Sequence, residues 1–259
     1  MNIAGRNIVI TGGASGIGKA LAQRFHKEGA KSITVADLQE GPLAEVAKSV
    51  GGLAVPCNVA KEADIQNLVA KAEEAYGPID IFCSNAGIAR YGFEETPDDI
   101  WQLNWDIHVM AHVYAARALV DKMIANGGGY LLNTASAAGL LSQVDSATYS
   151  TTKHAAIAFA ETLSIRYGDK GIRVSVLCPQ SVRTAMTESN LGGVASVDGV
   201  LEPEQLAHCV VDGIHKEEFL ILPHPQVAEY IRRKANDYDR WLKGMRKLRD
   251  AYLREELRG

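Results

Sequence analysis

Short, continuously apolar runs alternate with longer amphipathic segments along most of the chain. A strand covered on both faces is apolar throughout, as in parallel sheets. Repeated strand–helix units with right-handed crossovers give a doubly wound α/β fold. We predict seven strands, at 7–11, 32–37, 53–59, 80–87, 130–136, 173–179 and 219–223. Helices are predicted between them, at about 17–28, 40–49, 62–76, 97–126, 147–168 and 203–215.

Two segments depart from this alternation. Residues 185–201 are rich in small and polar side chains, which is typical of a loop or lid over a binding site. From Pro225 onward the chain is highly charged and is expected to form one long helix. Its apolar side chains repeat at helical spacing and predict a face for subunit contact or for closure over a pocket. These side chains are Trp241, Met245, Leu248 and Tyr252.

Composition excludes several classes of partner. The 259 residues are 47% hydrophobic and 22% charged, as in ordinary globular proteins, and the net charge of −4 predicts no nucleic acid or anionic membrane partner. No apolar run reaches the roughly 18 residues of a membrane span, and no signal-peptide pattern precedes Asn7. The four cysteines are far apart, so we expect small core residues in a reducing, cytoplasmic compartment.

The segment TGGASGIG, residues 11–18, follows the first predicted strand and opens the first predicted helix. Gly12, Gly16 and Gly18 permit a tight turn, a close approach of backbone to a pyrophosphate, and packing of helix on strand. Phosphates bind at such helix N-termini because free N–H groups point outward there. We therefore expect a Rossmann-type dinucleotide-binding domain over residues 1–224, followed by a helical extension over 225–259.

Asp37 ends the second predicted strand, nineteen residues after Gly18. A carboxylate at this position accepts hydrogen bonds from an adenosine ribose diol and repels a 2′-phosphate. Leu38 and Gln39 follow it and supply no cation to compensate. We therefore predict NAD rather than NADP. The alternative is that Asp37 caps the following helix.

Tyr149 and Lys153 lie four residues apart in a predicted helix, so their side chains share one face. A tyrosine pKa near 10 must fall by about three units, or about 4 kcal/mol, for proton exchange near pH 7. A cation about 4 Å away contributes roughly 4 kcal/mol at an effective dielectric near 20. The same spacing recurs at Tyr230 and Lys234, which we interpret as a solvated surface pair.

The glycine-rich turn, Asp37, the SNAG segment at 84–87, Ser136 and the Tyr149/Lys153 pair occur in one order on one α/β frame. From about Asn7 to Pro223 the chain thereby resembles the short-chain dehydrogenase/reductase family. The resemblance implies that Ser136 holds the substrate oxygen, that Tyr149 exchanges the proton, and that Lys153 tunes Tyr149 and binds the nicotinamide ribose. It implies cofactor contacts from Gly12, Ser15, Gly16, Ile17, Gly18, Asp37, Asn58, Val59, Asn85, Ala86, Gly87, Tyr149, Lys153, Pro179, Val182 and Thr184.

Two positions differ from the family pattern. Counting from Trp101 places His108 where relatives carry an asparagine that binds a water, so we expect His108 in the catalytic set, in a proton relay. Alternatively, His108 packs in its helix and Asn104 is the counterpart. His108 and His112 have metal-ligand spacing, but the glutamate of a zinc hydrolase is missing, so no metal site is expected. Gln180 replaces a glycine, and its side chain should face the nicotinamide or the substrate mouth, where it either supplies an amide contact or only occupies space.

We conclude that the chain is an NAD(H)-dependent oxidoreductase that interconverts a secondary alcohol and a ketone on a fairly hydrophobic small molecule. Substrate contacts are expected from Ala138, Gln143, Gln180 and Met186, with further apolar walls from Leu140, Leu141 and Leu191. Arg90 and Arg183 leave room for an anionic group on the substrate.

Two other functions remain open: a 3-oxoacyl-thioester (ACP or CoA) reductase of the same family, and a non-catalytic dinucleotide-binding sensor or scaffold. Asp37 argues against the first, and the intact Ser136, Tyr149 and Lys153 argue against the second. The resemblance also implies a homotetramer or homodimer built through the helices near 97–126 and 147–168.

Overall fold

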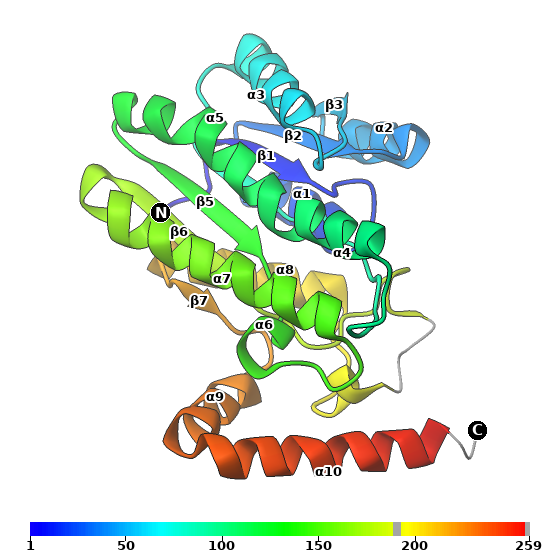
Figure 1. Ribbon diagram of the computed structural model, residues 1–259. Helices are drawn as coiled ribbons and strands as arrows, with labels where there is room; N and C mark the ends of the chain where they lie inside the picture. The colour runs from blue at the N-terminus through cyan, green and yellow to red at the C-terminus, as the bar shows by residue number, and fades with distance from the viewer. Residues whose placement is uncertain (189–192, 257–259) are drawn as a thin grey trace.

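In the computed structural model, which describes residues 1–188 and 193–256, seven parallel strands form one sheet in the order β3-β2-β1-β4-β5-β6-β7 (Figure 1). The strand order reverses between β1 and β4, which is where doubly wound folds bind their ligands. The predicted doubly wound α/β fold is therefore confirmed. The strands are β1 (Asn7–Thr11), β2 (Ser32–Asp37), β3 (Leu53–Pro56), β4 (Ile81–Ser84), β5 (Gly129–Thr134), β6 (Ile172–Leu177) and β7 (Leu220–Ile221).

Two helical layers cover the sheet because adjacent strand residues point to opposite faces. Val9 of β1 packs in the cluster with helices α3 (Glu62–Tyr76), α5 (Ala111–Ala125) and α7 (Ala147–Tyr167). Its neighbours Ile8 and Ile10 pack in the opposite cluster. That cluster is covered by α1 (Gly16–Lys27), α2 (Glu40–Ser49) and α8 (Pro203–Lys216).

Several predicted strands, β3 and β4 among them, end earlier than expected. β4 stops at Ser84, and the N–H of Asn85 donates to Thr11 Oγ1 at 2.9 Å instead of to a strand neighbour. β3 stops at Pro56, although the N–H of Cys57 still donates to the Asp37 carbonyl at 3.0 Å. The residues released from the sheet in this way form the loops at its carboxyl edge.

The helix predicted over 97–126 is divided into three parts. These are α4 (Asp98–Trp105), the π-helical turn η1 (Asp106–Met110) and α5. A π turn holds one residue more than an α turn and is frequent at functional sites. His108 lies within it, fully buried, with Nδ1 3.0 Å from Thr152 Oγ1 of α7. This bond is a tertiary contact, which helical periodicity does not reveal.

The C-terminal extension is two helices, so the prediction of one long helix was wrong. α9 (Gln226–Asn236) ends at Asp237, whose extended backbone (φ −155°) breaks the helix before α10 (Tyr238–Glu256). The Asp237 carboxylate accepts the N–H of Arg240 at 2.9 Å, which is an N-cap bond for α10. Figure 1 shows α10 running across the end of the molecule, with α9 between it and α6 (Ala138–Leu141).

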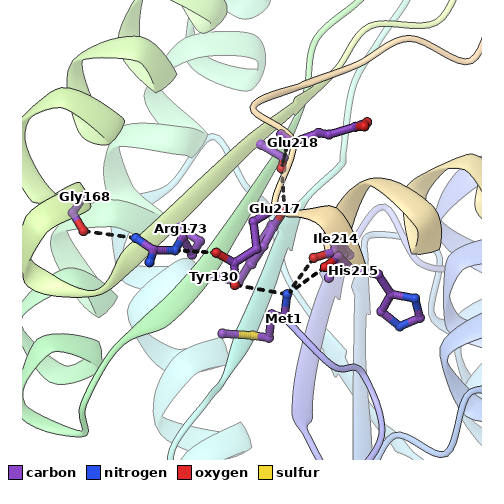
Figure 2. A network of polar contacts seen from close by, with 9 residues as sticks. Met1, Tyr130, Gly168, Arg173, Ile214, His215, Glu217 and Glu218 are labelled. Carbon is purple, nitrogen blue, oxygen red and sulfur yellow. Dashed lines mark hydrogen bonds and ion pairs between the residues drawn. The ribbon is translucent and has the colours of Figure 1, made fainter.

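A polar network ties the first residue to the amino edge of the sheet (Figure 2). The Met1 ammonium donates to the Ile214 carbonyl at 2.8 Å and lies 3.1 Å from Glu217 Oε1. Glu217 also pairs with Arg173 Nε of β6 at 2.6 Å. These hydrogen bonds hold the pKa of Glu217 below its ordinary value. The network lies at the opposite edge from the predicted site residues, so its role is structural.

In the described part of the chain, no helix combines the length and the apolar character that a membrane crossing requires. Three of the cysteines, Cys57, Cys83 and Cys178, are buried as expected, while Cys209 is half-buried. All four are free thiols.

Candidate active site

The carboxyl edge of the sheet gathers most of the predicted site residues, because parallel strands all end on the same side. Asp37 ends β2, and the segment 85–87 follows β4. Ser136 follows β5, and Pro179 follows β6. Side chains from distant parts of the sequence therefore meet around the switch point between β1 and β4.

The turn after β1 has no room for side chains at its glycines. Gly12 has φ +66°, and a Cβ there would lie 2.9 Å from Ala86 Cα. A Cβ at Gly18 would lie 2.0 Å from the Gly12 carbonyl oxygen. Ser15 is the N-cap of α1 and makes no cap hydrogen bond with its side chain, and Ile17 follows inside the first helical turn. This cradle of backbone N–H groups at a helix N-terminus fits the pyrophosphate of a dinucleotide.

The Asp37 carboxylate is held beside this turn. Its Oδ2 accepts the N–H of Ala14 at 3.2 Å, and its Oδ1 accepts the N–H of Gln39 at 3.2 Å. Gln39, rather than Asp37, is the N-cap residue of α2. The Asp37 carboxylate therefore lies beside the glycine turn at the carboxyl end of β2, and Gln39 holds the cap position of the next helix.

Asn58 and Val59 are less open to an adenine than expected. The Asn58 side-chain oxygen accepts the N–H of Ala60 at 3.1 Å, so one of its acceptor sites serves the local turn. Val59 is buried and packs in the core on the side of α3. A cofactor contact from Val59 would therefore come from its backbone.

The segment after β6 covers the glycine turn and joins it to the catalytic side. A Cβ at Gly16 would lie 3.0 Å from Thr184 Cγ2, and Val182 is buried. The Pro179 carbonyl accepts the Ala137 N–H at 2.8 Å and the Ser136 hydroxyl at 3.4 Å. The predicted contacts from Pro179, Val182 and Thr184 thus lie between the turn and Ser136.

Ser136, Tyr149 and Lys153 come together at the start of α7. Ser146 is the N-cap of this helix, and its hydroxyl accepts the Tyr149 N–H at 3.2 Å. The Lys153 ammonium lies 5.5 Å from the centroid of the Tyr149 ring and donates to the Thr134 carbonyl at 3.1 Å. The Ser136 hydroxyl lies near the Tyr149 phenol and lowers its pKa. A hydroxyl, a phenol and a buried ammonium therefore form one connected group.

A cavity of about 910 Å³ opens in front of this group. Ser136 and Tyr149 line it, as do all four residues predicted to contact a substrate, Ala138, Gln143, Gln180 and Met186. Most of its remaining wall is apolar, from Leu141, Val144, Val194, Val197, Trp241, Met245 and Leu248. This size and character are typical of a small-molecule site.

The sequence model of the family described as short chain dehydrogenase matches residues 6–192. The chain belongs to the short-chain dehydrogenase family. It is 34% identical over 190 residues to 3beta-hydroxysteroid dehydrogenase 2 of Eggerthella lenta, covering 70% of this chain and 73% of that protein.

Solved structures agree with this assignment. A short chain dehydrogenase/reductase from Burkholderia phymatum in complex with NAD superposes with a TM-score of 0.82 at 27% identity, covering 92% of this chain and 96% of the other. L-sorbose reductase of Gluconobacter frateurii, complexed with NADPH and L-sorbose, has a TM-score of 0.74 at 32% identity, with 82% and 91% covered. This short-chain dehydrogenase is thus an oxidoreductase of dinucleotide-dependent type that acts on CH–OH groups.

The electrostatics of the dehydrogenase site differ from the sequence-based argument. Burial raises the pKa of Tyr149 above its ordinary value, Tyr91 raises it further, and the nearby Ser136 hydroxyl lowers it. Burial lowers the pKa of Lys153 to about 8. Burial is the largest cause of the Tyr149 shift, whereas the sequence-based argument assumed a phenol in a partly solvated site. The protein chain by itself therefore keeps Tyr149 protonated, ready to donate.

His108 joins the site to the loop after β4. Its ring lies edge-on to Tyr149, with centroids 5.4 Å apart. Nε2 is 3.2 Å from the Ile88 N–H, and Nδ1 is 3.0 Å from Thr152 Oγ1. Burial and the nearby Lys153 ammonium hold the pKa of His108 well below its ordinary value. The ring is therefore a neutral imidazole with both nitrogens engaged, beside Gly87 and Lys153.

Asn104 and His112 are the two neighbours of His108 that its spacing raised as alternatives. Asn104 is also fully buried, but its amide donates to the backbone carbonyls of Arg90 and Ile100 at 3.1 and 2.9 Å. Burial, with Lys153, lowers the pKa of His112 to about 3. Within residues 1–188 and 193–256 no three metal-ligating side chains are grouped to hold an ion.

Tyr230 and Lys234 are not the solvated pair that we predicted. The Tyr230 hydroxyl donates to Asp198 Oδ1 at 3.0 Å, and its ring lines the cavity. Lys234 Nζ donates to the Leu140 carbonyl at 2.7 Å. Both residues attach α9 to the catalytic body, a tertiary role that their charged surroundings in the sequence concealed.

Other predicted walls and charges of the pocket need correction. Leu140 packs into the core clusters instead of lining the cavity, and Leu191 lies outside the described residues. Arg183 pairs with Glu202 at 2.8 Å, and neither it nor the exposed Arg90 is part of the cavity wall that the structure describes. Charged side chains reach the cavity from α9 and α10 instead.

Sequence reasoning missed two neighbours of the catalytic group. Tyr91 lies edge-on to Tyr149 with ring centroids 5.4 Å apart, and it lines the cavity. Thr152 fixes the His108 ring. Tyr91 stands in an irregular loop without periodicity, so no signal pointed to it, whereas Thr152 lies three residues after Tyr149 within the same helical turn.

Proposed function

We propose that this short-chain dehydrogenase uses NAD(H) to interconvert a secondary alcohol and a ketone on a fairly hydrophobic small molecule. The observation that carries the proposal is that Ser136 and Tyr149 form one wall of a largely apolar cavity of about 910 Å³. Cavities of this size bury most of the surface of a drug-sized ligand, and their few polar groups orient it. Here those polar groups are a hydroxyl and a phenol.

In the proposed mechanism, the Ser136 hydroxyl holds the substrate oxygen by a hydrogen bond. The phenol of Tyr149 exchanges the proton with that oxygen, as a general acid in reduction and, as phenolate, as a general base in oxidation. A bound nicotinamide dinucleotide supplies the hydride for reduction and accepts it in oxidation. The Lys153 ammonium, held by the Thr134 carbonyl at 3.1 Å, stabilises the phenolate form and binds the nicotinamide ribose.

We place His108 in this group as a positioning residue. Its neutral ring bridges the backbone of Ile88 and Thr152, and so fixes the loop after β4 against the turn of α7 that carries Tyr149. A proton relay through His108, our first interpretation, requires the ring to accept a proton, which burial and Lys153 oppose.

Oxidation of a panel of secondary alcohols, followed by the absorbance of NADH, tests the reaction. Tyr149→Phe should lower kcat/KM by about 10²–10⁴-fold, as expected for loss of a general acid–base group. Tyr167→Phe, at the end of the same helix and outside the cavity lining, is the matched control. A Tyr149→Phe enzyme as fast as the parent would overturn the mechanism. A lack of turnover with every alcohol and ketone tested would favour the non-catalytic sensor or scaffold.

The preference for NAD is proposed from Asp37. Its carboxylate is fixed beside the glycine turn by Ala14, and the exposed Leu38 follows it without a compensating cation. Turnover with NAD and NADP at equal concentration measures the preference directly. Faster turnover with NADP would refute this cofactor assignment and would raise the 3-oxoacyl-thioester reductase as the better substrate class.

We further propose that residues 1–224 are the catalytic domain, with 185–201 as a substrate loop and 225–259 as the helical extension. The described part of the loop contributes Met186, Val194 and Val197 to the cavity. Exposed Ile165 on α7, and Leu103 and Trp105 on α4, support a homodimer or homotetramer through these helices. Light scattering after size-exclusion chromatography would test this, and a monomeric parent would refute it.

A further inference from the structure

One wall of the cavity is built by the C-terminal extension. Trp241, Met245 and Leu248 of α10 line it and are half-buried. Their spacing of four and three residues places them on one helix face. The extension is therefore a wall of the substrate cavity, and its apolar stripe continues the apolar surface that begins at Leu141.

Three charged side chains lie among the residues of this wall, and two of them already have partners. Arg233 Nε pairs with Glu229 Oε1 at 2.9 Å. One oxygen of the Asp237 carboxylate accepts the Arg240 backbone N–H at 2.9 Å, which caps α10. The Arg240 guanidinium forms no ion pair with any acidic side chain in the described part of the chain. This wall of the cavity thus carries one guanidinium that has no ion-pair partner within the described part of the chain, although the Asp237 carboxylate is among the lining residues.

We infer that the substrate is an amphipathic hydroxy acid, in which an apolar skeleton separates the reacting CH–OH group from a carboxylate that Arg240 binds. This inference rests on the proposed function, because it names the substrate class of the same site. A guanidinium presents paired N–H donors that match a carboxylate. Arg240 is exposed at the edge of the cavity, so a carboxylate bound there keeps part of its hydration and is not buried without compensation.

The arrangement also sets the orientation of the substrate. The hydroxyl end meets Ser136 and Tyr149, the skeleton lies between Leu141 and the stripe of α10, and the anionic end reaches solvent at Arg240. A neutral alcohol of the same shape fills the same apolar section but lacks the contact at Arg240. The enzyme should therefore discriminate between a carboxylate and its ester, mainly through KM.

The test compares hydroxy acids with their methyl esters. Suitable probes are lithocholate, which has a rigid apolar skeleton between its hydroxyl and carboxylate, and 12-hydroxystearate, which has a flexible one. The parent, Arg240→Gln, Arg240→Glu and the control Arg246→Gln are assayed for kcat and KM by NADH formation. Arg246 is exposed on α10 and does not line the cavity, so its substitution removes the same charge from the same helix.

We expect the parent to prefer the acid over the ester for at least one pair. Arg240→Gln should lower the acid-to-ester ratio of kcat/KM by about 3–10-fold, mainly by raising KM for the acid, and Arg240→Glu should lower it further. The control should keep the parent ratio. Raising the salt concentration from about 0.05 to about 0.5 M should weaken the acid preference of the parent, because screening acts on exposed charges.

Equal use of acid and ester by the parent would overturn the inference, as would an acid preference that survives in Arg240→Glu. An equal fall of the acid-to-ester ratio in Arg246→Gln would also overturn the inference, because the effect would then come from the overall charge of α10. Calorimetric binding of the acids to the parent and Arg240→Gln separates this result from failure of the proposed function. Arg240-dependent binding without turnover would refute the reaction but not the anion subsite.

Discussion

Replacing Lys153 with methionine should stabilise the protein while destroying its activity. The Lys153 ammonium is 4% exposed, and burial lowers its pKa from the usual 10.4 or so to about 8. Below pH 8 the folded protein therefore keeps a charged group that burial disfavours by about 3 kcal/mol, at about 1.4 kcal/mol for each pKa unit. Methionine has a similar length and carries no charge.

Part of this gain is offset by a lost hydrogen bond. The ammonium donates to the Thr134 carbonyl at 3.1 Å, and removing that bond costs about 1 kcal/mol. The net stabilisation at pH 7 is thus about 2 kcal/mol. For a chain of this length each kcal/mol shifts Tm by roughly 2–4 °C, so we expect an increase of about 4–8 °C. The same variant should lose activity by about 10²-fold or more, because the phenolate of Tyr149 loses its cation.

The pH dependence of the Tm difference shows whether burial of the Lys153 charge causes the stabilisation. The folded pKa lies below the unfolded one, so the penalty on the parent is complete below about pH 8 and disappears as pH rises toward about 10.4. At about pH 9.5 the desolvation penalty on Lys153 has fallen to about 1 kcal/mol. The gain from removing it then equals the cost of the lost hydrogen bond, so parent and variant should have the same Tm. Thermal unfolding of cofactor-free protein at about pH 7 and 9.5 measures this.

The matched control for this experiment is Lys243→Met, an exposed position on α10 outside the cavity lining. Its Tm difference from the parent should be small and independent of pH, because an exposed ammonium has no desolvation cost to lose. A Lys153→Met protein that is less stable than the parent at pH 7 would refute the reasoning. So would a Tm difference that is the same at both pH values.

Three further predictions follow from particular contacts. Gly18→Ala places a Cβ 2.0 Å from the Gly12 carbonyl oxygen, so it should destabilise the fold by about 1–3 kcal/mol in thermal unfolding. It should also weaken dinucleotide binding measured by calorimetry. An unchanged Kd would contradict the proposed role of the glycine turn in holding the pyrophosphate. His108→Asn should lower kcat about 10-fold or more with an unshifted pH–rate profile, whereas a shifted profile would restore the relay interpretation. Ile165→Glu, at a position 84% exposed, should weaken the proposed oligomer in light scattering, and an unchanged mass would exclude this face.

Local chemistry in the sequence was sufficient for the frame of the fold and for the order of the site motifs. Continuously apolar strands such as β1 and β2, and the amphipathic helices α2 and α3, were predicted at their observed bounds because their patterns reflect burial on a regular sheet. The glycine turn and the spacing of Tyr149 and Lys153 are also local. Within one turn or one helix, the covalent chain alone decides which groups come together.

Tertiary contacts decided the rest, because they join residues whose separation in the sequence carries no period. The π turn at His108 depends on bonds to Ile88 and Thr152, and Tyr230 binds Asp198 across the loop. Burial, which no motif encodes, determined that Lys153 has a pKa of about 8. Only the folded chain showed that Arg240 lines the cavity, because α9 and α10 return across the carboxyl edge of the sheet.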